Sequence, residues 1–166
     1  MNYQGTIQED KEITSLLTRV FVEGGYTDKS VAEKTFVPSE VRKRGEIILA
    51  RSEMGTLLGM IICVCPTNPI RQVAEMDEAE IQLLAVYHEA RGQGIGSCLI
   101  AACESRGVSF GYAKMVLSTQ QTMKEAHRVY EQLGYRRNPT RDWSKGTKIF
   151  LVYEKLLDDT KQNSES

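Results

Sequence analysis

The chain has 166 residues, of which 41% are hydrophobic and 26% are charged, and 21 basic and 22 acidic side chains leave a net charge of -1 at pH 7. These values are typical of one globular domain and exclude a largely disordered chain. The near-zero charge argues against a nucleic-acid partner, and the longest apolar stretch, residues 57–65, is too short to span a membrane.

Hydrophobic periodicity and turn residues predict helices and strands in mixed order. In chain order, the predicted elements are a helix over residues 10–23, a helix between Asp28 and Gly45, strands over 46–51, 56–65 and 78–87, a helix over 94–110, a strand over 114–118, a helix over 122–133, a strand near Tyr135 and a strand over 148–155. The first two strands form a predicted hairpin, and Thr122 with Glu125 predicts a capping box. We therefore expect one α+β domain over residues 1–157 and a disordered polar tail over 158–166.

The N-terminus and the cysteines carry further expectations. Residues 1–5 have neither a basic start nor an apolar core, so we expect no secretory signal and a cytoplasmic location. The four cysteines contain no C-x-x-C pair, and no histidine lies at ligand spacing from them. They are Cys63, Cys65, Cys98 and Cys103. We expect buried free thiols and no metal site.

The predicted strand over 78–87 has one polar face, because side chains alternate along a strand. Glu78, Glu80 and Gln82 share this face, and we expect it to open to a polar space. The preceding segment, residues 66–74, contains two prolines and has no apolar period. This pattern predicts an exposed loop.

A glycine-rich turn, Arg91-Gly92-Gln93-Gly94-Ile95-Gly96, lies between a predicted strand and a predicted helix. Glycines let the backbone approach a ligand closely, and the unpaired amides at a helix start favour an anion. The dinucleotide fingerprint G-x-G-x-x-G fails at Ser97, and the nucleotide loop G-x-x-x-x-G-K-[ST] is absent. The remaining pattern, [QR]-x-x-G-x-[GA], predicts a phosphate-bearing cofactor, with a turn that binds no ligand as the alternative.

Together with residues 79–86 and 125–135, this turn resembles the GNAT superfamily of N-acetyltransferases, in element order over residues 6–156. The resemblance implies a mixed, mostly antiparallel sheet that is flanked by helices and splayed where acetyl-CoA, the cosubstrate, binds. Pantetheine would pair with the backbone of the last strand residues before the turn, and the pyrophosphate would lie on the amides of the turn. The implied cofactor-binding residues are Leu84, Ala85, Val86, Arg91, Gly92, Gln93, Gly94, Ile95, Gly96 and Ser97.

The resemblance also implies a reaction in which a primary amine attacks the acetyl thioester directly. Glu80 is the expected base, acting through water, and Glu78 or water alone remains open. Tyr130 stands at the family's position for the acid, and its phenol pKa of about 10 exceeds the thiol value of about 8.5, so it would donate only as thiolate charge develops. The alternatives are a solvated strand carboxylate for Glu80 and core packing for Tyr130. His127 is expected to be a surface imidazole.

Two features leave the function open in part. Many members of the superfamily carry Asn where Met123 stands, so contacts of this helix with the cofactor are in question. A non-catalytic acyl-CoA-binding module would keep the glycine turn without needing Glu80 or Tyr130, and a structural interaction domain would leave the turn empty. The acceptor, a small-molecule or peptide amine, and the oligomeric state, a homodimer included, stay undetermined.

Overall fold

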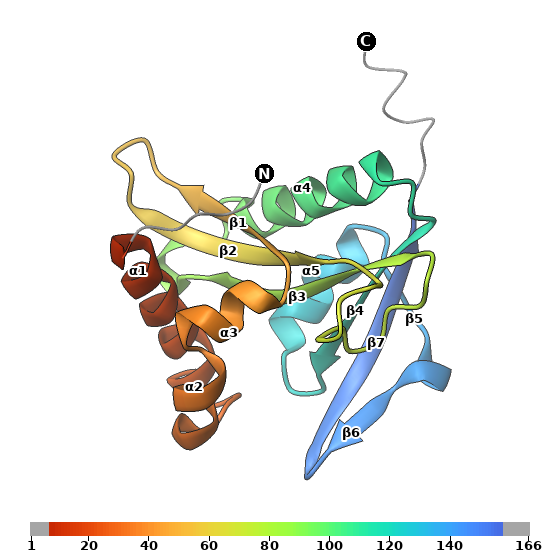
Figure 1. Cartoon of the computed structure of the whole chain (residues 1–166), viewed down its shortest axis with the longest axis horizontal. Coiled ribbons are helices and arrows are strands. Elements are labelled where there is room, and N and C mark those ends of the chain that lie inside the picture. Colours follow the sequence, from red (N-terminus) through yellow and green to blue (C-terminus); the bar gives the residue numbers. More distant parts are fainter. Residues whose placement is uncertain (1–6, 158–166) are drawn as a thin grey trace.

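The structure is a computed structural model that describes residues 7–157. Its centre is a seven-stranded sheet in the order β1-β2-β3-β4-β7-β5, with β6 paired to β7 (Figure 1). The strands are β1 (Glu46–Arg51), β2 (Leu57–Val64), β3 (Glu78–Val86), β4 (Lys114–Gln120), β5 (Arg136–Arg137), β6 (Trp143–Lys145) and β7 (Lys148–Leu156). Among the strand pairs of residues 7–157, only β3–β4 is parallel. This mixed, mostly antiparallel sheet agrees with the α+β prediction.

Helices cover both faces of the sheet. They are α1 (Ile7–Leu17), η1 (Thr18–Val22), α2 (Lys29–Thr35), α3 (Pro38–Lys43), η2 (His88–Ala90), α4 (Ile95–Ser109), α5 (Lys124–Gln132) and η3 (Pro139–Arg141). The first three α-helices group together on one side in Figure 1, where their apolar residues share a buried cluster with β1 and β2. Residues of α4 and α5 form a second buried cluster with β3, β4 and β7.

The N-terminal helices differ from the prediction in two places. The first helix begins at Ile7 and ends in the π-helical turn η1 rather than as one regular helix. The expected second helix is split, because Val37 takes the extended conformation that precedes a proline and Pro38 starts α3. The predicted hairpin is confirmed by the antiparallel pairing of β1 with β2.

The C-terminal part also corrects the prediction. The capping box is wrong, since α5 begins after Met123 and its first turn has no side-chain cap. The strand β6 was not predicted; three residues between turns leave too short a pattern to identify. The polar tail over 158–166 lies outside the described residues.

The cysteine prediction is wrong for all four residues. A disulfide joins Cys63 on β2 to Cys103 on α4, whereas Cys65 and Cys98 are free thiols that are exposed rather than buried. Sequence spacing could not reveal the bond, because its two cysteines are 40 positions apart and meet only when α4 packs on the sheet.

Two kinds of feature are missing from residues 7–157. None of the helices there combines the length and apolarity needed to cross a bilayer. No group of three or more His, Cys, Asp or Glu side chains in the same range is arranged to hold a metal ion.

Candidate active site

The strands β3 and β4 separate partway along their length. Their parallel pairing runs from Glu78 opposite Lys114 to Ile81 opposite Leu117. Beyond this point β3 stays paired with β2 as far as Val86, and β4 stays paired with β7 as far as Gln120. The facing backbone edges of β3 and β4 therefore lack strand partners from here on, which is the splay that the family resemblance implied.

A β-bulge lies on β3 at the start of the splay. Leu83 has φ of 48°, and it is the one non-glycine residue with positive φ in the described chain. Met60 pairs with Ala85 and Ile62 pairs with Gln82, so β3 has one more residue than β2 in this interval. Such a left-handed conformation costs a branched side chain on the order of 1–3 kcal/mol, and it persists only where the surrounding structure imposes it.

The bulge exchanges the two faces of β3. Before it, Ala79 and Ile81 belong to the cluster with α4 and α5; after it, Leu84 and Val86 belong to that same cluster. In an unbroken strand, residues 84 and 86 would share a face with residue 80, because alternation has a period of two. The extra residue therefore places the side chains of Leu84 and Val86 on the face opposite Glu80, whereas Ala85 belongs to the cluster with α1.

The glycine turn leads into α4 with unpaired amides. Gly92 and Gly94 have φ of 78° and 79°, and Gly94 is the residue that caps the helix. The first bond of the helix joins the Cys98 amide to the Gly94 carbonyl at 3.0 Å, and no side chain caps this end. The amides of Ile95, Gly96 and Ser97 are thus left without helical acceptors, at the positive end of a 15-residue helix.

The space around the turn is open. A Cβ built on Gly92, Gly94 or Gly96 would meet no heavy atom within 4 Å. Glycine is therefore required at 92 and 94 by backbone conformation rather than by crowding within the protein. An anion can reach the amides of this turn, which is the arrangement used to bind phosphate groups at helix starts.

Arg91 links the glycine turn to the end of β3 and to the start of α5. Its Nε donates a hydrogen bond to the Val86 carbonyl at 3.3 Å, and its guanidinium pairs with the Glu125 carboxylate at 3.2 Å. Both charged side chains are substantially exposed. The end of β3, the glycine turn and the start of α5 are thereby linked, and Glu125 serves this ion pair rather than a capping box.

Glu80 does not face an open polar space, which corrects the sequence interpretation. Residues 65–77, which we call the covering loop, lie over this face of β3, and the Glu80 side chain is only 1% exposed. The carboxylate accepts hydrogen bonds from the amides of Gln72, Val73 and Ala74 and from the Gln82 side chain. A carboxylate offers about four acceptor positions, so this arrangement leaves none for a water that would deprotonate an amine.

Glu78 is equally occupied. It is 3% exposed, it pairs with Arg141 at 2.8 Å and it accepts a bond from the Glu75 amide at 3.0 Å. Burial by itself raises the pKa of Glu78, but the hydrogen bonds from Arg141 and from the Glu75 amide bring the pKa below its usual value. A lowered pKa makes this carboxylate a weaker base.

Tyr130 lies on the same face as the predicted cofactor residues. Its ring is 5% exposed and packs 6.0 Å from the rings of Tyr135 and Tyr153, in the cluster that also includes Leu84, Val86 and Ile95. Burial raises the pKa of Tyr130, so the phenol stays protonated at neutral pH. The hydroxyl makes no hydrogen bond to another described residue.

His127 of α5 is buried, and Met123, which precedes α5, is partly buried. The prediction of a surface imidazole is wrong for His127, which is 7% exposed with Nε2 3.0 Å from the Gln120 carbonyl. Burial lowers the pKa of His127. Met123 packs against the cluster with α1, and its sulfur accepts a contact from Thr119 at 3.7 Å, so its side chain is directed into the core.

Sequence reasoning missed the bulge at Leu83 and the acceptors of the covering loop. Nothing in a leucine signals a positive φ. The row of Glu78, Glu80 and Gln82 could have indicated a covering segment, since buried carboxylates require hydrogen-bond donors. The donors to Glu80 are mostly backbone amides, however, and every residue except proline carries one, so the sequence does not identify them. The structure thus brings the glycine turn, Val86 and Tyr130 together, and it separates Glu80 from them.

Comparisons with known proteins agree with this architecture. The model of the acetyltransferase (GNAT) family matches residues 11–135. An uncharacterized N-acetyltransferase of Schizosaccharomyces pombe is 32% identical over 92 residues, which are 55% of this chain and 52% of that protein. The chain therefore matches about half the length of this curated relative.

Solved structures of low sequence identity share the fold. A GNAT-family acetyltransferase from Staphylococcus aureus Mu50 has a TM-score of 0.72 at 13% identity, over 95% of this chain and 98% of that one. An acetyltransferase from Streptococcus agalactiae 2603 has a TM-score of 0.72 at 18% identity, over 95% and 96%. An aminoglycoside 6'-N-acetyltransferase complexed with coenzyme A has a TM-score of 0.69 at 18% identity, over 95% and 96%. The fold that the resemblance implied is confirmed.

Proposed function

Because the chain belongs to the acetyltransferase (GNAT) family, we propose that it transfers the acetyl group of acetyl-CoA to a primary amine by direct attack. The observation that carries the proposal is the start of α4, where the amides of Ile95, Gly96 and Ser97 lack acceptors beside two glycines of positive φ. The fold neighbour complexed with coenzyme A supports the same cosubstrate.

The cofactor would follow the splay. Leu84, Ala85 and Val86 come directly after the bulge, and their edge toward β4 is not used in strand pairing. This free edge can pair with the amide groups of pantetheine, and the turn over residues 91–97 can bind the pyrophosphate. Acetyl-CoA would be a cosubstrate, and the proposal requires no metal.

The reaction needs a donor for the departing sulfur. Tyr130 is proposed to give its phenol proton to the thiolate as the C–S bond breaks, since its raised pKa keeps it protonated until the charge develops. An amide at the end of β3, near Val86, would stabilise the oxyanion that forms when the amine nitrogen attacks the carbonyl carbon.

The proton of the attacking amine is proposed to leave to water. Glu80 and Glu78 are the two carboxylates expected from the sequence, and both are engaged by the covering loop or by Arg141. Of the alternatives left open by the sequence, water alone fits this arrangement. We propose that Glu80 instead positions the covering loop, which reaches the splay where Ser118 of β4 donates to Gln72 at 3.2 Å.

The acceptor is proposed to be a small-molecule or peptide amine. Of the four acidic residues over 75–80, Glu78 pairs with Arg141 and Glu80 is buried among hydrogen-bond donors, whereas Glu75 and Asp77 are exposed. These two exposed carboxylates can attract a cationic amine.

Two measurements test the proposal. Coenzyme A should raise the melting temperature of the full chain, because a ligand that binds only the native state shifts unfolding by mass action. Free thiol should be released from acetyl-CoA when primary amines are added one by one. A melting shift without turnover on any amine would favour the binding module, and no shift at all would leave only the structural domain.

A further inference from the structure

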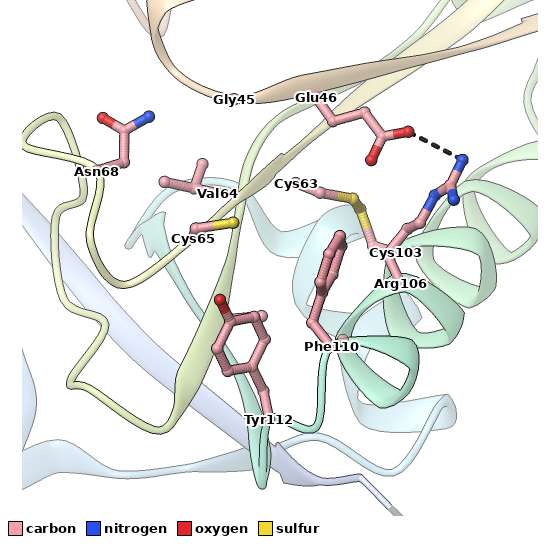
Figure 2. A pocket seen from close by; sticks show the side chains of 12 residues that line it. Gly45, Glu46, Cys63, Val64, Cys65, Asn68, Cys103, Arg106, Phe110 and Tyr112 are labelled. Atoms are coloured by element: carbon pink, nitrogen blue, oxygen red, sulfur yellow. Dashed lines mark ion pairs between the residues drawn. A yellow bond between two sulfur atoms is a disulfide. The ribbon is translucent and has the colours of Figure 1, made fainter. Parts of the chain in front are cut away.

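Three cysteines meet at a pocket on the far part of α4, away from the glycine turn. The cavity has a volume of about 240 Å³ and is lined by Cys63, Cys65, Cys103, Arg106, Phe110 and Tyr112, among others (Figure 2). This volume is below the range of about 300–1,000 Å³ that is usual for drug-sized ligands, so the cavity suits a smaller molecule.

The pocket lies where α4 is fastened to the sheet. The disulfide between Cys63 and Cys103 forms part of its wall, and Arg106 of α4 pairs with Glu46 of β1 at 2.9 Å across the same region (Figure 2). Because Glu46 already neutralises Arg106, the pocket offers no free cation for an anionic ligand. Its distinctive chemical groups are the three sulfurs.

The sulfurs differ in accessibility. Cys103 is fully buried, Cys63 is partly exposed, and Cys65 is an exposed free thiol. Cys63 lies near the end of β2 and Cys65 directly follows the strand, and the side chains of these two residues point to the same side (Figure 2). Figure 2 shows the Tyr112 hydroxyl directed toward Cys65, and the hydrogen bond between them helps to raise the pKa of Tyr112 beyond the effect of burial.

We propose that this pocket is a thiol–disulfide exchange site, at which a low-molecular-weight thiol opens the Cys63–Cys103 bond and Cys65 takes over the attached thiol. The thiolate is the reactive form in such exchange. The hydroxyl of Tyr112 is directed toward Cys65, the thiol that takes part in the second exchange. The inference does not depend on acetyl transfer.

The exchange balances in three steps. A small thiolate attacks the sulfur of Cys63, the bond to Cys103 breaks, and the Cys103 thiolate takes a proton from water. The thiolate of Cys65 then attacks the sulfur of the attached molecule, and Cys63 leaves as a thiolate. A second small thiol releases the first from Cys65 as a symmetrical disulfide, so that two small thiols are oxidised and one protein disulfide is reduced.

Opening the bond would loosen α4. Cys103 lies eight residues beyond Ile95, about 12 Å along the helix from the glycine turn. A disulfide whose cysteines are 40 positions apart restricts the unfolded chain considerably, so reduction should lower the melting temperature by about 8–15 °C.

The test uses the full chain purified without reductant and then treated with 2-mercaptoethanol. Samples taken over time are alkylated, and mass spectrometry identifies which cysteines are free, alkylated or joined to the small thiol. We expect two free thiols at the start and four at the end, with a transient adduct on Cys65. Cys65→Ser should slow the reduction at least fivefold and move the adduct to Cys63.

Control variants and a comparison of thiols of different size make the test decisive. Cys98→Ser, which removes the exposed thiol outside the pocket, should leave the rate unchanged, and Tyr112→Phe should slow transfer to Cys65. A thiol attached to a large polymer should react far more slowly than 2-mercaptoethanol. Four free thiols in the untreated protein would overturn the proposal, as would equal reduction rates for the wild type and Cys65→Ser.

Discussion

Replacing Glu80 by Gln should destabilise the protein, because this carboxylate holds the covering loop on the sheet. The side chain is 1% exposed and accepts bonds from three backbone amides and from Gln82. Glutamine keeps one acceptor oxygen but replaces the other oxygen with an NH2 group, and this donor would face the donors that now bond to the carboxylate. Rotating the Gln82 amide does not repair the mismatch, since its oxygen accepts from Arg44 and its nitrogen donates to the Ile70 carbonyl.

The expected loss follows from the unpaired donors. Each buried donor without an acceptor costs about 1–3 kcal/mol, so one or two of them lower the free energy of unfolding by about 2–4 kcal/mol. For a chain of this size that corresponds to a fall in melting temperature of roughly 5–15 °C. Asp77→Asn is the matched control, because Asp77 is exposed in the same loop and should change the melting temperature little.

The assay combines thermal unfolding with steady-state kinetics on a true amine acceptor. A positioning role predicts lower stability and a raised KM for the amine, with no recovery of kcat at high pH. A catalytic base predicts the reverse: an unchanged melting temperature and a kcat deficit that shrinks as pH rises and the amine loses its proton unaided. The second pattern would show that the covering loop opens and that our interpretation of Glu80 is mistaken.

Three further substitutions test other parts of the structure. Gly94→Glu should abolish the melting shift caused by coenzyme A, because it places a residue with a Cβ at a left-handed φ and adds a negative charge beside the amides. A full shift in this variant would contradict the anion site. Tyr130→Phe should lower kcat by about 10²- to 10⁴-fold in single turnovers with little change in coenzyme A affinity, and a wild-type rate would return Tyr130 to core packing. His127→Gln should flatten the pH dependence of stability. Burial lowers the pKa of His127 in the folded state, so the wild type loses stability as pH falls from about 6.5 toward that lowered value. Equal slopes of melting temperature against pH in both proteins would refute this.

Features that depend on local sequence patterns were predicted correctly from the sequence. The hairpin of β1 and β2, the strand before the glycine turn and the helix after it were all predicted to within a few residues, because alternation, helical spacing and glycine each act locally. The disulfide and the covering loop depend on residues that approach only after the sheet has formed, and spacing along the chain does not encode such approaches.

The bulge at Leu83 decides which face of β3 carries the side chains of Leu84 and Val86. Alternation continued through residue 86 without the bulge would place Glu80 on the same face as Leu84 and Val86. The bulge reverses the alternation: residues 79 and 81 before it and residues 84 and 86 after it pack in the same cluster with Tyr130. A polar row on one side of a strand can therefore end at a bulge and serve a loop, while the backbone beyond the bulge is left free for a ligand.

The position at which β3 and β4 separate and the position at which β3 changes faces coincide within two residues, from Ile81 to Leu83. One irregularity in the strand thus gives both an unpaired backbone edge, which the proposed pantetheine site uses, and an apolar face directed toward α4 and α5.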